Sequence, residues 1–177
     1  MNFEMESMSI ELPEVAKHPN RQPFCGVLTL VDAASDRPPS GARGHRVMLS
    51  TTATEKALPS LLGMALDYAP ELDRHDARRK VGIITSAEIA GGIKASSGGG
   101  QKLAVSGYLF AKDFPEIVRE IRKSGHSRLG MSYEIADVRV ADVNAKVWTI
   151  VECTFTGAAV LLREKAAYGQ TWIGLVN

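Results

Sequence analysis

Short segments with strand character, separated by turns that contain glycine or proline, most limit the folds open to this 177-residue chain. In several of these segments apolar and polar residues alternate, as they do in strands with one buried face. Strands are expected at residues 24–32, 45–50, 80–86, 102–110, 129–140, 146–155 and 171–176. Because strands joined by hairpin turns pair antiparallel, this succession predicts a mainly antiparallel sheet.

Three helices are expected between the strands, at residues 51–68, 113–124 and 157–168. The middle helix has the clearest signals, since Asp113 and Glu116 have the spacing of a capping box and Gly125 is a natural stop. The whole pattern predicts an α+β fold, namely a small β-barrel or strongly bent sheet with about three helices outside it.

The first residues differ in composition from the rest of the chain. Four glutamates precede the first basic residue, and prolines interrupt the segment. We expect residues 1–22 to form an arm that is partly flexible or lies extended on a neighbour. Residues 23–177 have the length of one domain.

Composition excludes several classes of protein. The formal net charge is +1, which gives no strong field for nucleic acid or for a membrane surface. Cys25 and Cys153 have neither disulfide nor zinc spacing, and both are expected to fill core space as thiols. No apolar run approaches membrane-helix length and no secretion signal is recognised, so synthesis in the cytoplasm is the default expectation.

The segment Leu129-Gly-Met-Ser-Tyr-Glu-Ile135 contains the candidate nucleophile, Ser132. Alternation puts Met131, Tyr133 and Ile135 on one face of the strand, and Ser132 and Glu134 on the other. If the apolar face packs inward, Ser132 stands where a polymer could reach it.

His75 is the histidine with the most suggestive setting, because Asp73 and Asp76 flank it and carboxylates favour an imidazolium. The alternative is a solvated histidine in a charged loop. The other three histidines, His18, His45 and His126, are interpreted as surface residues.

Glu152 is an acid inside an otherwise apolar run, and a carboxylate there needs a partner or water. If its strand pairs with the serine strand through the turn at Asp142, Ser132 and Glu152 can share a sheet face. The alternative is a half-exposed surface glutamate.

Two apparent motifs fail. Gly125-His-Ser127 lacks the second glycine of a nucleophile elbow and has no strand before it. The glycines from Gly98 onward lack the spacing and the helix of a phosphate loop. No His, Cys and Asp cluster has metal-ligand spacing, so no metal or cofactor is expected.

Four segments, in their order along the chain, resemble the tailed-phage prohead proteases, capsid maturation peptidases related in fold to the herpesvirus assemblins. These are His75-Asp76 before Val81-Gly82, Lys102–Gly107 with the helix that follows, Leu129–Tyr133, and Val151–Phe155 before Gly157-Ala-Ala159. The resemblance covers residues 24–168. The chain departs from the family at Glu134, where glycine is common, and at Cys153-Thr154, where Val-Ser is common.

The resemblance implies a serine endopeptidase without metal or cofactor. Ser132 would be the nucleophile, His75 the general base and Glu152 the acid that orients His75. Backbone amides, together with Arg128, would hold the oxyanion, at a place that the sequence does not locate. The implied substrates are scaffold and major capsid protein segments, and the chain itself, cut inside the assembling prohead in the host cytoplasm. By analogy with assemblins, a homodimer is expected.

Two other functions remain open at the level of sequence. One is a catalytically inactive phage structural or scaffold-like protein that keeps the fold, in which Ser132 and His75 lie too far apart for proton transfer. The other is an unrelated β-rich binding module, in which Ser132 and Glu152 face different surfaces and an apolar groove lies elsewhere.

Overall fold

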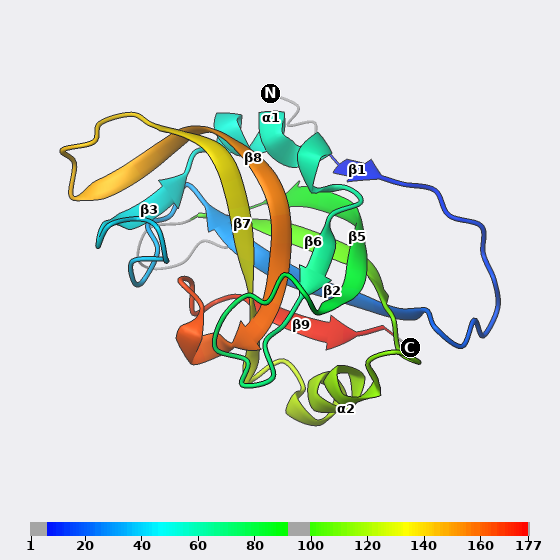
Figure 1. Cartoon of the computed structure of the whole chain (residues 1–177). Coiled ribbons are helices and arrows are strands. Elements are labelled where there is room, and N and C mark those ends of the chain that lie inside the picture. The colour runs from blue at the N-terminus through cyan, green and yellow to red at the C-terminus, as the bar shows by residue number, and fades with distance from the viewer. Residues whose placement is uncertain (1–6, 92–99, 177) are drawn as a thin grey trace.

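Six strands that close into a β-barrel form the centre of the protein in the computed structural model, which describes residues 7–91 and 100–176 (Figure 1). Around the ring, the strands are β5 (Lys80–Ala90), β4 (Ala65–Asp67), β8 (Val147–Leu162), β3 (Arg46–Leu49), β2 (Gln22–Val31) and β6 (Gln101–Leu109). Pairing of β5 with β6 closes the ring. The expected α+β fold with a small barrel is therefore confirmed.

Three further strands extend the sheet beyond the ring. β1 (Ser7–Ser9) pairs with β5, β7 (Leu129–Val140) pairs with β8, and β9 (Trp172–Leu175) pairs with β2. Most pairings are antiparallel, as expected, but β3 lies parallel to both β2 and β8, and β4 lies parallel to β8. Part of the expected arm is thus a strand on the sheet, and its first six residues lie outside the described ones.

The first helix is shorter than expected. α1 spans Thr51–Leu61, with the Ser50 side chain accepting a hydrogen bond from the Ala53 amide, and Pro59 lies inside it. The expected continuation to residue 68 is wrong, because Gly63 turns the chain with φ +79° and the next residues form β4 between β5 and β8. The strand pairing of β4 on both of its edges outweighs the helix that the spacing of the leucines predicts.

The second helix, α2 (Pro115–Ser124), is confirmed, but its cap is not. Phe114 precedes the helix and offers no side-chain cap. The Asp113 carboxylate instead accepts a hydrogen bond of 2.7 Å from the Asn20 side chain. Gly125 ends the helix with φ +54°, as expected.

The third expected helix, at residues 157–168, is wrong. β8 continues to Leu162, and only a 3-10 turn at Arg163–Lys165 follows. Ala158 and Ala159 are fully buried because β7 covers one edge of this part of β8 and β4 covers the other. Two α-helices therefore accompany the barrel in the described part of the chain.

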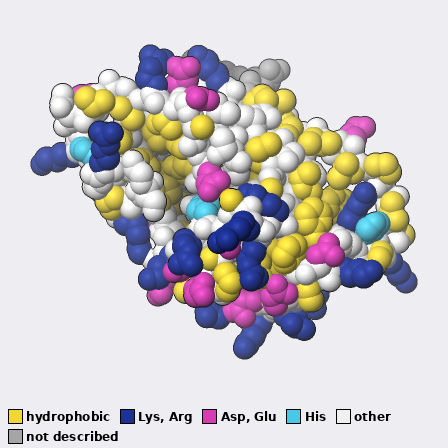
Figure 2. Space-filling model, in the orientation of Figure 1, with side chains coloured by type: hydrophobic (Ala, Val, Ile, Leu, Met, Phe, Trp, Pro, Cys, Tyr) yellow, Lys and Arg dark blue, Asp and Glu magenta, His cyan; other side chains and the backbone are white. Residues whose placement is uncertain are grey.

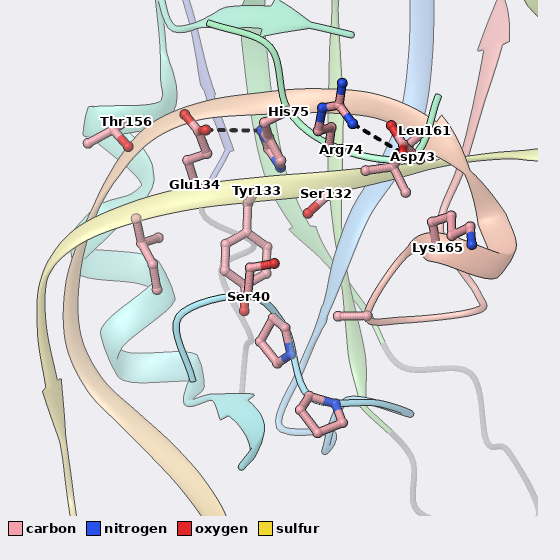
Figure 3. A pocket seen from close by; sticks show the side chains of 14 residues that line it. Ser40, Asp73, Arg74, His75, Ser132, Tyr133, Glu134, Thr156, Leu161 and Lys165 are labelled. Atoms are coloured by element: carbon pink, nitrogen blue, oxygen red, sulfur yellow. Dashed lines mark hydrogen bonds and ion pairs between the residues drawn. The ribbon is translucent and has the colours of Figure 1, made fainter. Parts of the chain in front are cut away.

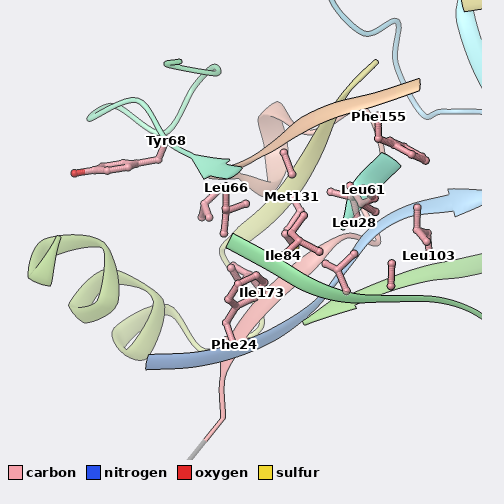
Figure 4. Close-up of a cluster of buried hydrophobic side chains, with 14 of the residues drawn as sticks. Phe24, Leu28, Leu61, Leu66, Tyr68, Ile84, Leu103, Met131, Phe155 and Ile173 are labelled. Carbon is pink, nitrogen blue, oxygen red and sulfur yellow. The ribbon is translucent and has the colours of Figure 1, made fainter. Parts of the chain in front are cut away.

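The main hydrophobic core fills the barrel (Figure 4). Its largest fully buried side chains include Phe24, Leu28, Phe155, Ile84 and Leu103. Cys153 is a buried thiol, as expected, whereas Cys25 is only half-buried, and both are free. None of the described helices is long and apolar enough to span a membrane.

Candidate active site

Ser132 and His75 line one cavity of about 600 Å³ at the surface of the barrel (Figure 3). Its walls come from β7, from the charged connection between β4 and β5, from the loop at Pro38–Ser40, and from the chain after β8. On the face shown in Figure 2, Lys and Arg side chains gather beside a histidine near the centre, with Asp and Glu among them. The cavity lining itself carries both signs of charge, from Asp73 and Glu134 and from Arg74 and Lys165.

The alternation of β7 positions the serine. Met131 is buried, and Tyr133 packs edge-on against Phe155 with ring centroids 5.9 Å apart. Ser132 and Glu134 line the cavity, as do Tyr133 and Ile135 of the same strand. The Met131 amide donates to the buried Thr171 hydroxyl at 3.2 Å, which fixes the strand next to the serine.

His75 lies with its Nδ1 atom between two carboxylates. The distance from Nδ1 to Asp67 Oδ1 is 3.7 Å, and the distance to Glu134 Oε1 is 3.2 Å. This nitrogen is buried, yet it makes no hydrogen bond of acceptable geometry within the described residues. Since Nδ1 faces the carboxylates, Nε2 is the ring nitrogen that remains to accept a proton.

Asp67, at the end of β4, is fully buried. Its Oδ2 binds Lys80 Nζ at 3.2 Å, and its Oδ1 accepts a hydrogen bond from the Asp76 amide at 3.2 Å. Burial by itself raises the pKa of Asp67, but His75, the backbone amide and Lys80 outweigh it and hold the pKa below its ordinary value. Asp67 is therefore an ionised carboxylate in a fixed position.

Glu134 lies on β7, two residues after the serine, opposite Gly157 of β8. A Cβ atom at position 157 would lie 3.0 Å from Glu134 Oε2, so the glycine leaves room for this carboxylate. The Glu134 side chain is 38% exposed and remains open to the cavity.

Sequence reasoning missed both acids. Asp67 was assigned to a helix, although a lone acid in the apolar run Ala65-Leu-Asp-Tyr-Ala69 was a signal of a buried carboxylate with a partner. Glu134 is expected on the same face of the strand as Ser132 and departs from the family pattern, but the sequence predicts no contact between it and His75.

Glu152 does not lie at His75. In the register of the β7–β8 hairpin, Ser132 pairs with Ala159, whereas Glu152 pairs with Arg139. Seven residues of strand separate Glu152 from Ala159, which is about 23 Å along an extended chain. Glu152 is exposed and forms an ion pair of 2.9 Å with Arg139. The interpretation of Glu152 as the orienting acid is therefore wrong.

Arg128 also lies apart from the serine. Its guanidinium binds Glu120, and its side chain lines a neighbouring cavity together with Arg163. The three remaining histidines make local contacts. His45 stacks on Trp148 and His126 packs on Trp172, while His18 accepts a hydrogen bond from the Asn20 amide.

The arrangement offers two kinds of chemistry. A serine and an imidazole backed by carboxylates are the components of acyl transfer, although Ser132 Oγ makes no hydrogen bond within residues 7–91 and 100–176. The donor atoms of Asp67, His75 and Glu134 also lie within 4.8 Å of one another, a spacing at which they could hold a metal ion. The sequence predicted no metal cluster, because these residues come from three separate segments.

No protein-family model, curated protein or solved structure matches this chain.

Proposed function

We propose that the protein is a serine endopeptidase in which Ser132 is the nucleophile and His75 the general base. The observation that supports this proposal is that both residues line one cavity while Nδ1 of His75 faces an ionised, buried carboxylate. Asp67 takes the orienting role that the resemblance implies for Glu152.

Each residue has a defined task in the proposed reaction. Ser132 Oγ attacks a peptide carbonyl, and its proton passes to Nε2 of His75. The resulting imidazolium is stabilised through its Nδ1–H by Asp67 and Glu134. The imidazolium then gives the proton to the leaving amine. Water activated by the same imidazole hydrolyses the acyl-enzyme and regenerates Ser132.

The two carboxylates differ in the parts they play. Asp67 is farther from Nδ1 but is held in place by Lys80 and a backbone amide, so it sets the orientation of the ring. Glu134 is nearer but half-exposed, and it adds negative charge beside the imidazolium. Removing an orienting acid of this kind costs a serine protease about 10⁴ in turnover.

The proposed biological role rests on the resemblance of residues 24–168 to prohead proteases. In this role the enzyme cuts scaffold and major capsid protein segments, and itself, inside the assembling prohead in the host cytoplasm, and it acts as a homodimer. The closed barrel with exterior helices is compatible with the assemblin-like fold that the resemblance implies.

The test is co-production of the chain with the major capsid and scaffold proteins, followed by mass spectrometry of the products. Wild type is expected to release defined fragments, and Ser132→Ala none. Glu152→Gln is the matched control, because that acid lies far from the cavity, and it should cleave as wild type does. Cleavage that persists in Ser132→Ala would refute the assignment of the nucleophile.

A catalytically inactive structural protein is the second candidate, and the lack of a Ser132–His75 hydrogen bond among the described residues favours it. Apo proteases often show long catalytic contacts, so the geometry alone does not decide. A fluorophosphonate probe separates the two, since it labels an activated serine. Labelling of wild type but not of His75→Ala supports the peptidase, whereas equal absence of labelling in both supports the inactive protein.

The third function, a β-rich binding module, has one observation in its favour. Ser132 and Glu152 line different cavities, as that function requires. The convergence of Ser132, His75 and two carboxylates nevertheless favours a chemical site over a docking surface.

A further inference from the structure

The nitrogen Nδ1 of His75 has an unusual setting for a simple triad. It is buried and makes no hydrogen bond in the part of the chain that the structure describes, although two carboxylate oxygens lie 3.2 and 3.7 Å away. A formed N–H···O bond combines a distance of about 2.7–3.2 Å with good alignment. The contact with Asp67 is too long, and the contact with Glu134 has the distance without the alignment. The imidazole nitrogen thus lies close to two carboxylate oxygens and forms a hydrogen bond with neither.

That spacing suits a zinc ion. Tetrahedral zinc, with bonds of about 2.0–2.2 Å, places its ligand atoms about 3.3–3.6 Å from one another. The two distances from Nδ1, 3.2 and 3.7 Å, lie close to the two ends of this range. The donor atoms of all three residues lie within 4.8 Å of one another, so a small movement of the exposed Glu134 side chain would complete the spacing. One imidazole and two carboxylates form a donor set of zinc type, whereas calcium and magnesium prefer oxygen ligands alone.

The surroundings fit a metal site in two further respects. Lys80 and the Asp76 amide bind the Asp67 carboxylate and fix its position, as hydrogen-bonding partners commonly do for the ligands of a metal. Lys80 also offsets one carboxylate charge, so one uncompensated negative charge remains with neutral His75. The half-exposed Glu134 opens the site to the cavity, which supplies an entry path and room for a water ligand.

We propose that Asp67, His75 and Glu134 bind Zn²⁺ reversibly and that this binding switches off Ser132. Zinc coordination rests on the geometry above, and the inhibitory effect rests on the proposed peptidase function. A neutral imidazole carries one ring proton. With zinc on Nδ1 that proton sits on Nε2, and Nε2 can no longer accept the proton of Ser132.

Zinc binding is tested by titrating the metal-free full-length chain in competition with a chromogenic chelator. One zinc per wild-type chain is expected. His75→Ala and Glu134→Gln should each weaken binding by about tenfold or more. Ser132→Ala and Glu152→Gln should bind as wild type does, since neither residue is a ligand. Circular dichroism checks that each variant is folded, and Asp67 is left intact because it is buried.

The proposal fails if wild type binds no zinc, or if folded His75→Ala binds zinc as tightly as wild type. The second outcome would place the metal elsewhere, for example at an exposed histidine. Because Ser132→Ala is titrated without any substrate, this result does not depend on peptidase activity.

The inhibitory effect is tested on wild-type cleavage of the capsid and scaffold proteins. Activity should fall as zinc occupies the site, with a midpoint that matches the titration, and chelation should restore it. Full activity at saturating zinc would overturn the inhibition. If wild type binds zinc but never cleaves or labels, the peptidase function fails and the metal site stands.

Discussion

Two carboxylates approach the same nitrogen of His75, and their surroundings decide how they differ. Asp67 is buried, ionised and held by Lys80 and a backbone amide. Glu134 is partly exposed and has room to move, because its cross-strand neighbour is a glycine. The fixed acid therefore suits orientation of the ring, and the adaptable acid suits exchange of a ligand at the cavity.

The charge of Asp67 should make stability depend on acidity. Its pKa in the folded protein lies below the ordinary value of 3.8. A depressed pKa stabilises the fold at pH values above the unfolded pKa, and this contribution is lost as pH falls through the folded pKa. Asp67→Asn is expected to lower the free energy of unfolding by about 1–3 kcal/mol at neutral pH, since Lys80 loses its partner.

Urea unfolding between neutral pH and about pH 3 measures this effect. The difference between wild type and Asp67→Asn should shrink as the solution becomes more acidic. Asp73→Asn is the control, because that acid lies in the same connection and is far more exposed. A difference that stays constant down to the lowest pH would show that Asp67 carries no linked proton.

At the scale of elements, the β7–β8 hairpin forms the site and the chain after β8 supports it. Ser132 and Glu134 come from β7, and Gly157 comes from the part of β8 that was expected to be helical. Thr171 lies just before β9, and its hydroxyl accepts a hydrogen bond from the Met131 amide. This bond holds β7 in position beside the serine. The nucleophile thus depends on a segment about 40 residues further along the chain.

Gly130→Ala tests this support. A Cβ atom at position 130 would lie 2.6 Å from Thr171 Oγ1 and 3.2 Å from the Arg163 backbone, so the strand or its neighbour must shift. Overpacking of this kind costs about 1–3 kcal/mol, and it should also lower labelling of Ser132 by the fluorophosphonate probe. Urea unfolding measures the first effect.

Gly91→Ala is the matched control, since its Cβ would meet no atom of the described chain within 4 Å. It should leave both stability and labelling near wild-type values. If Gly130→Ala behaves in the same way, β7 is not held by Thr171.

At the scale of the whole molecule, closure of the barrel encloses one main core. Cys153 belongs to this core, so its reactivity measures how well the core is protected. Burial raises the pKa of the Cys153 thiol to about 11, so only about 0.1% is thiolate at pH 8. Cys25 is half-buried and lies outside that enclosure. Iodoacetamide at pH 8 is therefore expected to modify Cys25 first and Cys153 much more slowly.

Peptide mass spectrometry over time distinguishes the two thiols. Denaturant below the unfolding midpoint should accelerate modification of Cys153 more than that of Cys25, because Cys153 is the more buried thiol and gains more exposure when the surrounding structure opens. Equal rates at both positions in native buffer would contradict the protection of Cys153 by burial.

The sequence by itself determined the elements whose signals are local. Alternation along residues 129–140 gave a strand with Ser132 on the face away from the core, and apolar spacing with Gly125 gave α2. The tertiary structure alone decided what depends on pairing between distant segments. Residues 65–67 and 157–162 form strands because neighbouring strands on both sides supply partners for their backbone hydrogen bonds.

The same dependence governs the acids. Which carboxylate meets His75 follows from the register of β7 on β8 and from where β4 ends, and neither is encoded in local periodicity. That register carried Glu152 to Arg139 and brought Glu134 and Asp67 to the imidazole. The sequence alone thus predicts which face of its strand Ser132 occupies. Which side chains surround His75 depends on how the strands pair in the closed barrel.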